Sequence, residues 1–166
     1  MKNNLGLLLT KRALINPERE AYVDAQSDLR LNFEELNARC NRVANSLLKI
    51  GIKPGDRVAL ALMNSAEFIE TYFAIAKIGG VVVPLNWRLV PDELEFILGD
   101  SGAKTLIFSE EFIDIFCELH NRGDKTDITT WVQTSGENAT PDFALDYEDF
   151  CDKSSDSEPK IGAEED

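Results

Sequence analysis

Apolar side chains recur at intervals of three and four residues between residues 32 and 51, which is the spacing of one face of an α-helix. Asn32 offers an N-cap side chain, and Glu35 follows three residues later, as in a capping box. Gly51 suits the left-handed turn that ends many helices. The apolar stripe consists of Phe33, Leu36, Cys40, Val43, Ala44, Leu47 and Leu48. These signals predict an amphipathic helix that begins after Asn32 and ends before Gly51.

Short apolar runs alternate with helical patterns along the rest of the chain up to residue 133. Strands are predicted at residues 57–62, 81–85, 104–108 and 128–133. Helices are predicted from residue 64 or 65, from Pro91 and from Ser109, and a first helix over 4–15 and a short hairpin over 21–31 precede them. The unbroken apolar run 81–85 is typical of a strand that is covered on both faces. Because short turns join strands and helices in the order β-α-β-α-β-α-β, we predict a three-layer α/β fold with a mainly parallel sheet.

Charge is distributed unevenly over a chain of ordinary globular composition, with 43% apolar and 28% charged residues and a net charge of −13. Acidic and basic side chains balance over residues 1–99, so the whole excess lies in residues 100–166. Without a basic surplus, the chain does not suit nucleic acid or an anionic membrane surface. We therefore predict a partial α/β domain over residues 1–136 and an acidic, largely flexible linker or tail over 137–166.

Cysteine and histidine are too few and too scattered for a metal site or a disulfide framework. The cysteines are Cys40, Cys117 and Cys151, and His120 is the one histidine. We expect reduced thiols and core packing for the cysteines, and a helix-end position for His120. The apolar run at residues 5–9 is too short to span a bilayer or to form the core of a signal peptide. These observations predict a cytoplasmic protein without a transmembrane segment.

Candidate ligand-binding residues follow the predicted strands, since ligands bind at the carboxyl ends of strands in parallel sheets. They are residues 63–65, 86–88, 109–110 and 134–136. Residues 134–136 look like the start of a phosphate loop, but Glu137 follows and neither a further glycine nor a lysine does. We interpret them as an ordinary loop. No residue of the chain is predicted to be catalytic or to bind a metal.

Arg88 is the one candidate contact for a ligand. It follows a strand end beside Trp87, where a guanidinium group suits a phosphate or carboxylate with two hydrogen bonds. The structural alternative is an ion pair with Asp92 or Glu93 on the next helix. Spacing alone favours the ion pair.

Two stretches of the chain resemble known family motifs. Residues 31–45 (LNFEELNARCNRVAN) and 51–58 (GIKPGDRV) resemble the opening motif of the adenylate-forming (AMP-binding) superfamily. Residues 73–89 (FAIAKIGGVVVPLNWRL), followed by PDEL at 91–94 and DSGA at 100–103, resemble its second motif. Asn86 stands where peptide-synthetase adenylation domains usually carry aspartate, so the chain is most similar to the acyl-CoA synthetases, especially the fatty-acid–CoA ligases.

The resemblance implies a reaction and a set of cofactors. Enzymes of this family use ATP, Mg²⁺ and coenzyme A to convert a carboxylate into an acyl-adenylate and then into a thioester. Arg88 matches the arginine that lies near the phosphates of coenzyme A in some of these ligases, and this raises a ligand-binding role to equal weight with the ion pair. The phosphate loop with its lysine, the acidic ribose-binding motif and the C-terminal lysine of the family are absent. Residues 158–166 resemble the stretch that precedes that loop.

The resemblance therefore predicts the N-terminal portion of a longer acyl-CoA ligase that is inactive alone. It is expected to bind no ATP and to hold no cofactor of its own, with at best weak binding of coenzyme A through Arg88. Its expected partners are the remaining ligase segments or a second copy of the chain. The alternative is a non-catalytic binding or assembly module, or a truncated relic, that complements a partner chain. A small flavodoxin-like nucleotide-binding protein is a third, weaker hypothesis.

Overall fold

Five parallel strands form the central layer of the protein in the computed structural model, which describes residues 4–123, 125–134, 136 and 139–160. They are β3 (Arg57–Ala61), β4 (Val81–Pro84), β5 (Thr105–Phe108), β6 (Thr130–Gln133) and β7 (Ala144–Asp146). Their order across the sheet is β4-β3-β5-β6-β7, and every neighbouring pair is parallel.

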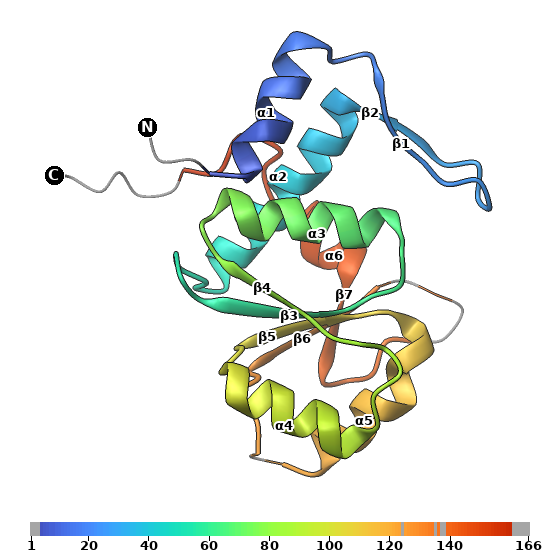
Figure 1. The fold of residues 1–166 in the computed structure, drawn as a ribbon, viewed down its shortest axis with the longest axis vertical. Coiled ribbons are helices and arrows are strands. Elements are labelled where there is room, and N and C mark those ends of the chain that lie inside the picture. The colour runs from blue at the N-terminus through green and yellow to red at the C-terminus, as the bar shows by residue number, and fades with distance from the viewer. Residues whose placement is uncertain (1–3, 124, 135, 137–138, 161–166) are drawn as a thin grey trace, which may run out of the picture.

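Helices cover both faces of this sheet (Figure 1). One face carries α2 (Phe33–Lys49), α3 (Ala66–Lys77) and α6 (Tyr147–Asp152), and the other carries α4 (Pro91–Ser101) and α5 (Ile113–Asn121), which a 3₁₀ turn at Glu110–Phe112 precedes. Helix α1 (Gly6–Ile15) packs outside α2 and α3, and β1 (Glu20–Val23) pairs with β2 (Arg30–Asn32) in an antiparallel hairpin. The predicted three-layer α/β fold is confirmed. Among the helices of the described ranges, none is both long and apolar enough to cross a bilayer.

Alternation along the inner strands divides the core into two clusters. In β3, Val58 and Leu60 face α2 and α3, whereas Ala59 and Ala61 face α4 and α5. Phe108 of β5 lies with the second pair and is fully buried. Each face of the sheet is therefore sealed by its own helices, as the near-continuous apolar character of β3 and β5 requires.

Local signals predicted both ends of α2 and the start of α3 correctly, whereas Ser109 makes no side-chain cap and α5 begins only at Ile113. The Asn32 side chain accepts a hydrogen bond from the Glu35 backbone at 2.8 Å, and the Glu35 carboxylate accepts one from the Asn32 backbone at 2.9 Å. The Ser65 hydroxyl accepts from the Phe68 backbone at 3.3 Å and so begins α3. Gly51 has a φ of +92°, the left-handed conformation expected after α2.

The strand β4 lies at the edge of the sheet and is partly covered on both faces. Val82 packs against the cluster beneath α2 and α3, and Val83 packs against the cluster beneath α4 and α5, as its apolar run predicts. Val81, at the start of the strand, is 45% exposed. An apolar run indicates helices above and below a strand, but it does not indicate whether another strand lies beside it in the sheet.

Regular structure is present within residues 137–166, the stretch predicted to be an acidic, largely flexible linker or tail. Ala144–Asp146 forms β7, which pairs with β6, and α6 packs against α2. The segment 153–160 then continues beside α2. Residues 137, 138 and 161–166 lie outside the described residues, so the likeness of residues 158–166 to the stretch before a phosphate loop is only partly within the structure.

Candidate functional site

Loops from three strands meet at the carboxyl edge of the sheet. The Ser109 hydroxyl, after β5, accepts a hydrogen bond at 3.2 Å from the backbone N–H of Met63, which follows β3. The Thr134 backbone N–H, after β6, donates to the carbonyl of Phe108 at 2.9 Å. The edge is therefore a connected surface, and it is where a ligand is expected in this fold class.

Arg88 stands at this edge, just beyond β4. Its backbone N–H donates to the Asn86 side chain at 3.1 Å, and its guanidinium carbon lies 4.7 Å from the centre of the Trp87 ring. Both side chains are exposed. Stacking on an aromatic face orients the guanidinium plane and leaves its N–H groups free to donate to an anion.

The alternative role for Arg88, an ion pair with the following helix, is not found among the described residues. Asp92 binds Arg122 instead, at 2.6 Å. The carboxylate of Glu93 accepts a hydrogen bond from the Val90 backbone at 3.2 Å and caps α4. Asp92 and Glu93, the residues expected to form an ion pair with Arg88, therefore interact with other groups.

The described part of the loop after β6 lies beside a carboxylate. The Glu110 carboxylate occupies the space that a Cβ atom at position 136 would need, so a larger residue at Gly136 would require that side chain to move. An anion approaching Gly136 would meet this carboxylate, and residues 134–139 contain no lysine or arginine. Ser135, the middle residue of the loop 134–136, lies outside the described residues.

The histidine and two of the cysteines belong to the packing, whereas Cys117 is only partly buried. His120 stacks on Phe143 with ring centres 4.0 Å apart and meets Trp131 edge-on. Cys40 and Cys151 are buried, and burial raises the pKa of both thiols well above the ordinary value. In the described part of the chain, no group of three or more His, Cys, Asp or Glu residues could hold a metal ion.

A buried ion pair that the sequence analysis missed joins α2 to α3. Arg39 donates from Nε to the carboxylate of Glu70, whose side chain is 1% exposed, and the Tyr147 hydroxyl donates to the second carboxylate oxygen at 3.1 Å. Burial raises the pKa of Glu70, although the bonds from Arg39 and Tyr147 oppose the rise. The three residues come from three elements far apart in the sequence. They link α2, α3 and α6.

Gln133, at the end of β6, is a second buried polar residue that the pattern of apolar runs did not reveal. It is fully buried, and within the described parts of the chain neither the oxygen nor the nitrogen of its amide has a hydrogen-bond partner. Its strand places it beside Phe108 and Asp146 in the register. In the sequence, its place at the end of an apolar run is the feature that could have indicated a buried amide.

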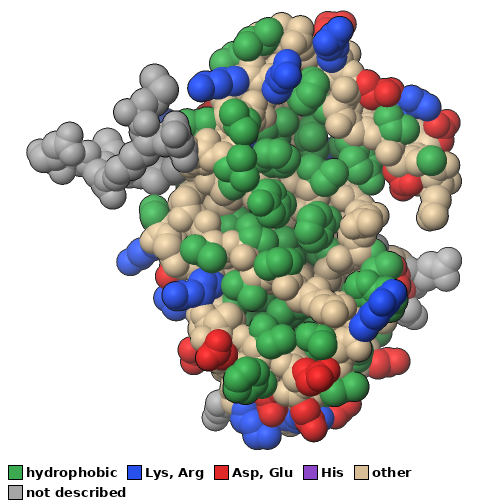
Figure 2. Space-filling view, in the orientation of Figure 1, with side chains coloured by type: hydrophobic (Ala, Val, Ile, Leu, Met, Phe, Trp, Pro, Cys, Tyr) green, Lys and Arg blue, Asp and Glu red, His purple; other side chains and the backbone are tan. Residues whose placement is uncertain are grey.

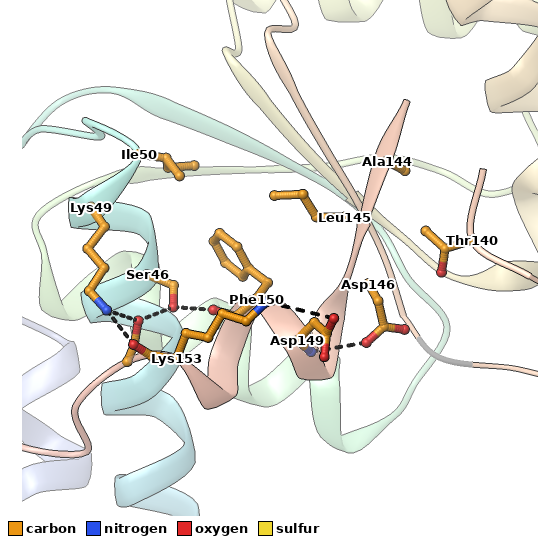
Figure 3. A pocket seen from close by; sticks show the side chains of 11 residues that line it. Ser46, Lys49, Ile50, Thr140, Ala144, Leu145, Asp146, Asp149, Phe150 and Lys153 are labelled. Atoms are coloured by element: carbon orange, nitrogen blue, oxygen red, sulfur yellow. Dashed lines mark hydrogen bonds and ion pairs between the residues drawn. The ribbon is translucent and has the colours of Figure 1, made fainter. Parts of the chain in front are cut away.

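A pocket of about 390 Å³ lies between the end of α2, β7 and α6 (Figure 3). Its walls are largely apolar, with Ile50, Leu145 and Phe150 among them. Lys49 donates to the Ser154 hydroxyl at 2.9 Å, and Lys153 pairs with Asp149 at 3.8 Å. The pocket therefore combines a largely apolar surface with hydrogen-bonded lysines and the carboxylates of Asp146 and Asp149 at its wall.

Comparison with known proteins gives a consistent picture. The family model described as AMP-binding enzyme matches residues 9–164. The long-chain-fatty-acid–CoA ligase FadD13 of Mycobacterium tuberculosis is 38% identical over 130 residues, which cover 78% of this chain and 26% of that protein. Feruloyl-CoA synthase of Amycolatopsis is 34% identical over 152 residues, 91% of this chain and 30% of that protein.

Solved structures agree with these matches. A Mycobacterium tuberculosis fatty acyl CoA synthetase superposes with a TM-score of 0.84 and 33% identity, covering 95% of this chain and 30% of that one. The inhibitor-bound N-terminal domain of FACL13 from the same organism gives a TM-score of 0.85 and 33% identity, covering 96% of this chain and 38% of that one. The chain therefore spans less than a third of the length of these curated relatives.

Proposed function

Because the chain belongs to the AMP-binding enzyme family, we propose that it is the N-terminal portion of an ATP-dependent acyl-CoA ligase. One observation carries the proposal: the family match extends over residues 9–164, yet the chain spans only 26% and 30% of two CoA-forming relatives. The proposed reaction joins a carboxylic acid to the thiol of coenzyme A through an acyl-adenylate, and we assign a fatty acid or related carboxylate as its substrate.

We further propose that the chain is inactive alone. A triphosphate needs backbone N–H donors together with a cation, because charge develops on its oxygens as the reaction proceeds. The Glu110 carboxylate over Gly136 and the lack of a lysine in that loop support the view that these groups come from other segments of the ligase. What this chain contributes is the sheet, its carboxyl edge and Arg88. Three cysteines without disulfide bonds support a cytoplasmic location.

A non-catalytic assembly module is the second candidate, and a surface feature of the chain is compatible with it. Apolar side chains gather on the face that carries α3 and β4 (Figure 2). A groove of about 620 Å³ there is lined in part by Leu5, Tyr72 and Val82. An apolar surface of this kind marks a contact with another segment or chain. It fits a ligase remainder and a separate partner equally.

Sequencing the genomic DNA beyond codon 166 separates the two candidates. The ligase proposal predicts an in-frame continuation that soon encodes a loop rich in threonine, serine and glycine and containing a lysine. A stop codon followed by unrelated DNA would instead support the module or a relic.

Arg88 gives a prediction on ligand binding. We propose that its guanidinium binds a phosphate of coenzyme A, so the chain should bind coenzyme A weakly and Arg88→Ala should weaken that binding at least about tenfold. Isothermal titration at low salt measures the dissociation constants. Arg30→Ala is the control, since Arg30 is an exposed arginine that pairs with Glu20 in the hairpin. Equal affinity of the Arg88→Ala and unsubstituted chains, or no binding by either, would rule out the assignment.

A further inference from the structure

One face of α2 holds the segment 153–158 by a regular series of polar contacts. Asn45 donates to the carbonyls of Ser155 and Ser157 at 2.7 and 2.9 Å, and Asn41 donates to the carbonyl of Asp156 at 2.8 Å. Lys49 adds a hydrogen bond to the carbonyl of Lys153. Positions 41, 45 and 49 lie four residues apart and so share a face of the helix. The segment, red in Figure 1, runs beside α2 toward α1.

The series ends at a buried ammonium group. Lys77, the last residue of α3, has a side chain that is 1% exposed. Its Nζ donates to both carboxylate oxygens of Glu158, at 3.0 and 2.9 Å, to Thr10 Oγ1 at 2.7 Å and to Asn37 Oδ1 at 2.8 Å. A buried cation is tolerated only when it is paired and hydrogen-bonded, and Glu158 supplies its one opposite charge among the described residues.

The Glu158 carboxylate is in turn enclosed by donors from three helices. Thr10 of α1 donates at 3.1 Å, and Asn37 and Asn41 of α2 donate at 2.8 and 3.2 Å, in addition to Lys77 of α3. These hydrogen bonds outweigh the effect of burial, so the pKa of Glu158 lies below its ordinary value. The arrangement satisfies a carboxylate more completely than a surface ion pair does.

The enclosed carboxylate is reachable from solvent. The Glu158 side chain is 43% exposed, and it borders a groove of about 400 Å³ between α1 and α2. Ala13, Leu14 and Ala38 form the apolar part of the groove. A small external carboxylate could therefore enter from this side if the glutamate side chain were removed.

We propose that α1, α2 and α3 form a carboxylate-binding site that Glu158 fills in cis, and that this site locks the segment 153–158 onto α2. Lys77 is its central positioning residue. One consequence rests on the proposed function. By holding the segment 153–158 against α2, this site fixes the position of Pro159, from which the chain continues toward the segments of the ligase that bind ATP. The site itself does not depend on that function.

The test uses NMR relaxation of the 166-residue chain. In the unsubstituted chain, backbone order parameters over 154–158 should be near the rigid value of about 0.85, and Glu158→Ala should lower them below about 0.6 while β5 is unchanged. Glu158→Gln keeps the shape but removes the charge, and it should release the segment in the same way if the alanine variant is too unstable to measure. Asp156→Asn is the control, since the Asp156 side chain only approaches Arg42, at 3.9 Å.

Rescue by an external carboxylate separates a binding site from a merely structural contact. Sodium acetate added to Glu158→Ala should shift the amide resonances of Thr10, Asn37 and Lys77 in a saturable way and raise the melting temperature. Sodium chloride at equal ionic strength, and acetate added to Lys77→Met/Glu158→Ala, should do neither. Order parameters that stay near the rigid value in both Glu158 variants would overturn the lock, and acetate effects that chloride reproduces would overturn the carboxylate site.

Discussion

Replacing Arg39 with methionine is expected to lower the free energy of unfolding by about 3–5 kcal/mol. The substitution keeps the apolar stem but removes the guanidinium that pairs with Glu70, whose side chain is 1% exposed. Among the described residues, the Tyr147 hydroxyl, at 3.1 Å, is then the one hydrogen-bond donor left to the buried Glu70 carboxylate. Domains of this kind are stable by about 5–15 kcal/mol, so the loss is a large fraction of the total. Urea unfolding at pH 7, followed by circular dichroism, measures it.

The pH dependence of this loss has a definite sign. Burial raises the pKa of Glu70 in the folded chain, and removing Arg39 raises it further. A carboxyl with a raised folded-state pKa favours the folded state at low pH and loses that contribution as pH rises through the folded pKa. The difference in unfolding free energy between Arg39→Met and the unsubstituted chain should therefore be smaller at pH 5 than at pH 8.

Arg42→Met is the matched control for this prediction. Arg42 lies one turn along the same helix, is 40% exposed and approaches Asp156 only at 3.9 Å. Its loss should cost no more than about 1 kcal/mol. Similar losses in the two variants, or a difference that does not change with pH, would contradict the role given to the Arg39–Glu70 pair.

Replacing Phe108 with alanine is expected to cost about 3–5 kcal/mol. The residue is fully buried in β5, a central strand, and its ring centre lies 4.9 Å from that of Phe116 on α5. Truncation removes the ring from the cluster between the sheet and helices α4 and α5, and close packing leaves a cavity behind. The midpoint of urea unfolding should fall while its slope is unchanged, which is the signature of lower stability without a change in the surface exposed.

Phe96→Ala is the control for the core prediction, because Phe96 lies on α4 but is 72% exposed. Its effect should stay within about 0.5 kcal/mol. If Phe108→Ala does not fold, Phe108→Leu should show a smaller loss of the same sign. A Phe108 variant as stable as Phe96→Ala would mean that the described core is wrong.

Local sequence signals were sufficient for most of the helices and for the strands β3 to β6. Asn32, Ser65 and Gly51 act through neighbours within a few residues, so their roles can be read from spacing alone. β7 was not predicted, because local signals do not report contacts between residues that are far apart in the sequence. It is three residues long and lies in an acidic stretch, and its support comes from pairing with β6, which no local pattern records.

The site was less predictable than the fold. Arg88 was identified at a strand end, but its stacking on Trp87 depends on side-chain geometry, and its expected partner Asp92 is taken by Arg122, 30 residues away in the sequence. The sites around Glu70 and Lys77 join residues 31 and 81 positions apart. The position of a lysine within an apolar helical pattern does not indicate that its side chain is buried against a distant glutamate.

Pyrophosphate release from ATP by the purified 166-residue chain tests most directly whether the groups that activate the carboxylate lie outside residues 1–166. The assay combines the chain with Mg²⁺, coenzyme A and medium- or long-chain fatty acids, and a sample without the chain gives the background. We predict release equal to that background at every chain concentration. Release that requires the fatty acid and rises in proportion to the chain would contradict the proposal that this portion of the ligase is inactive alone.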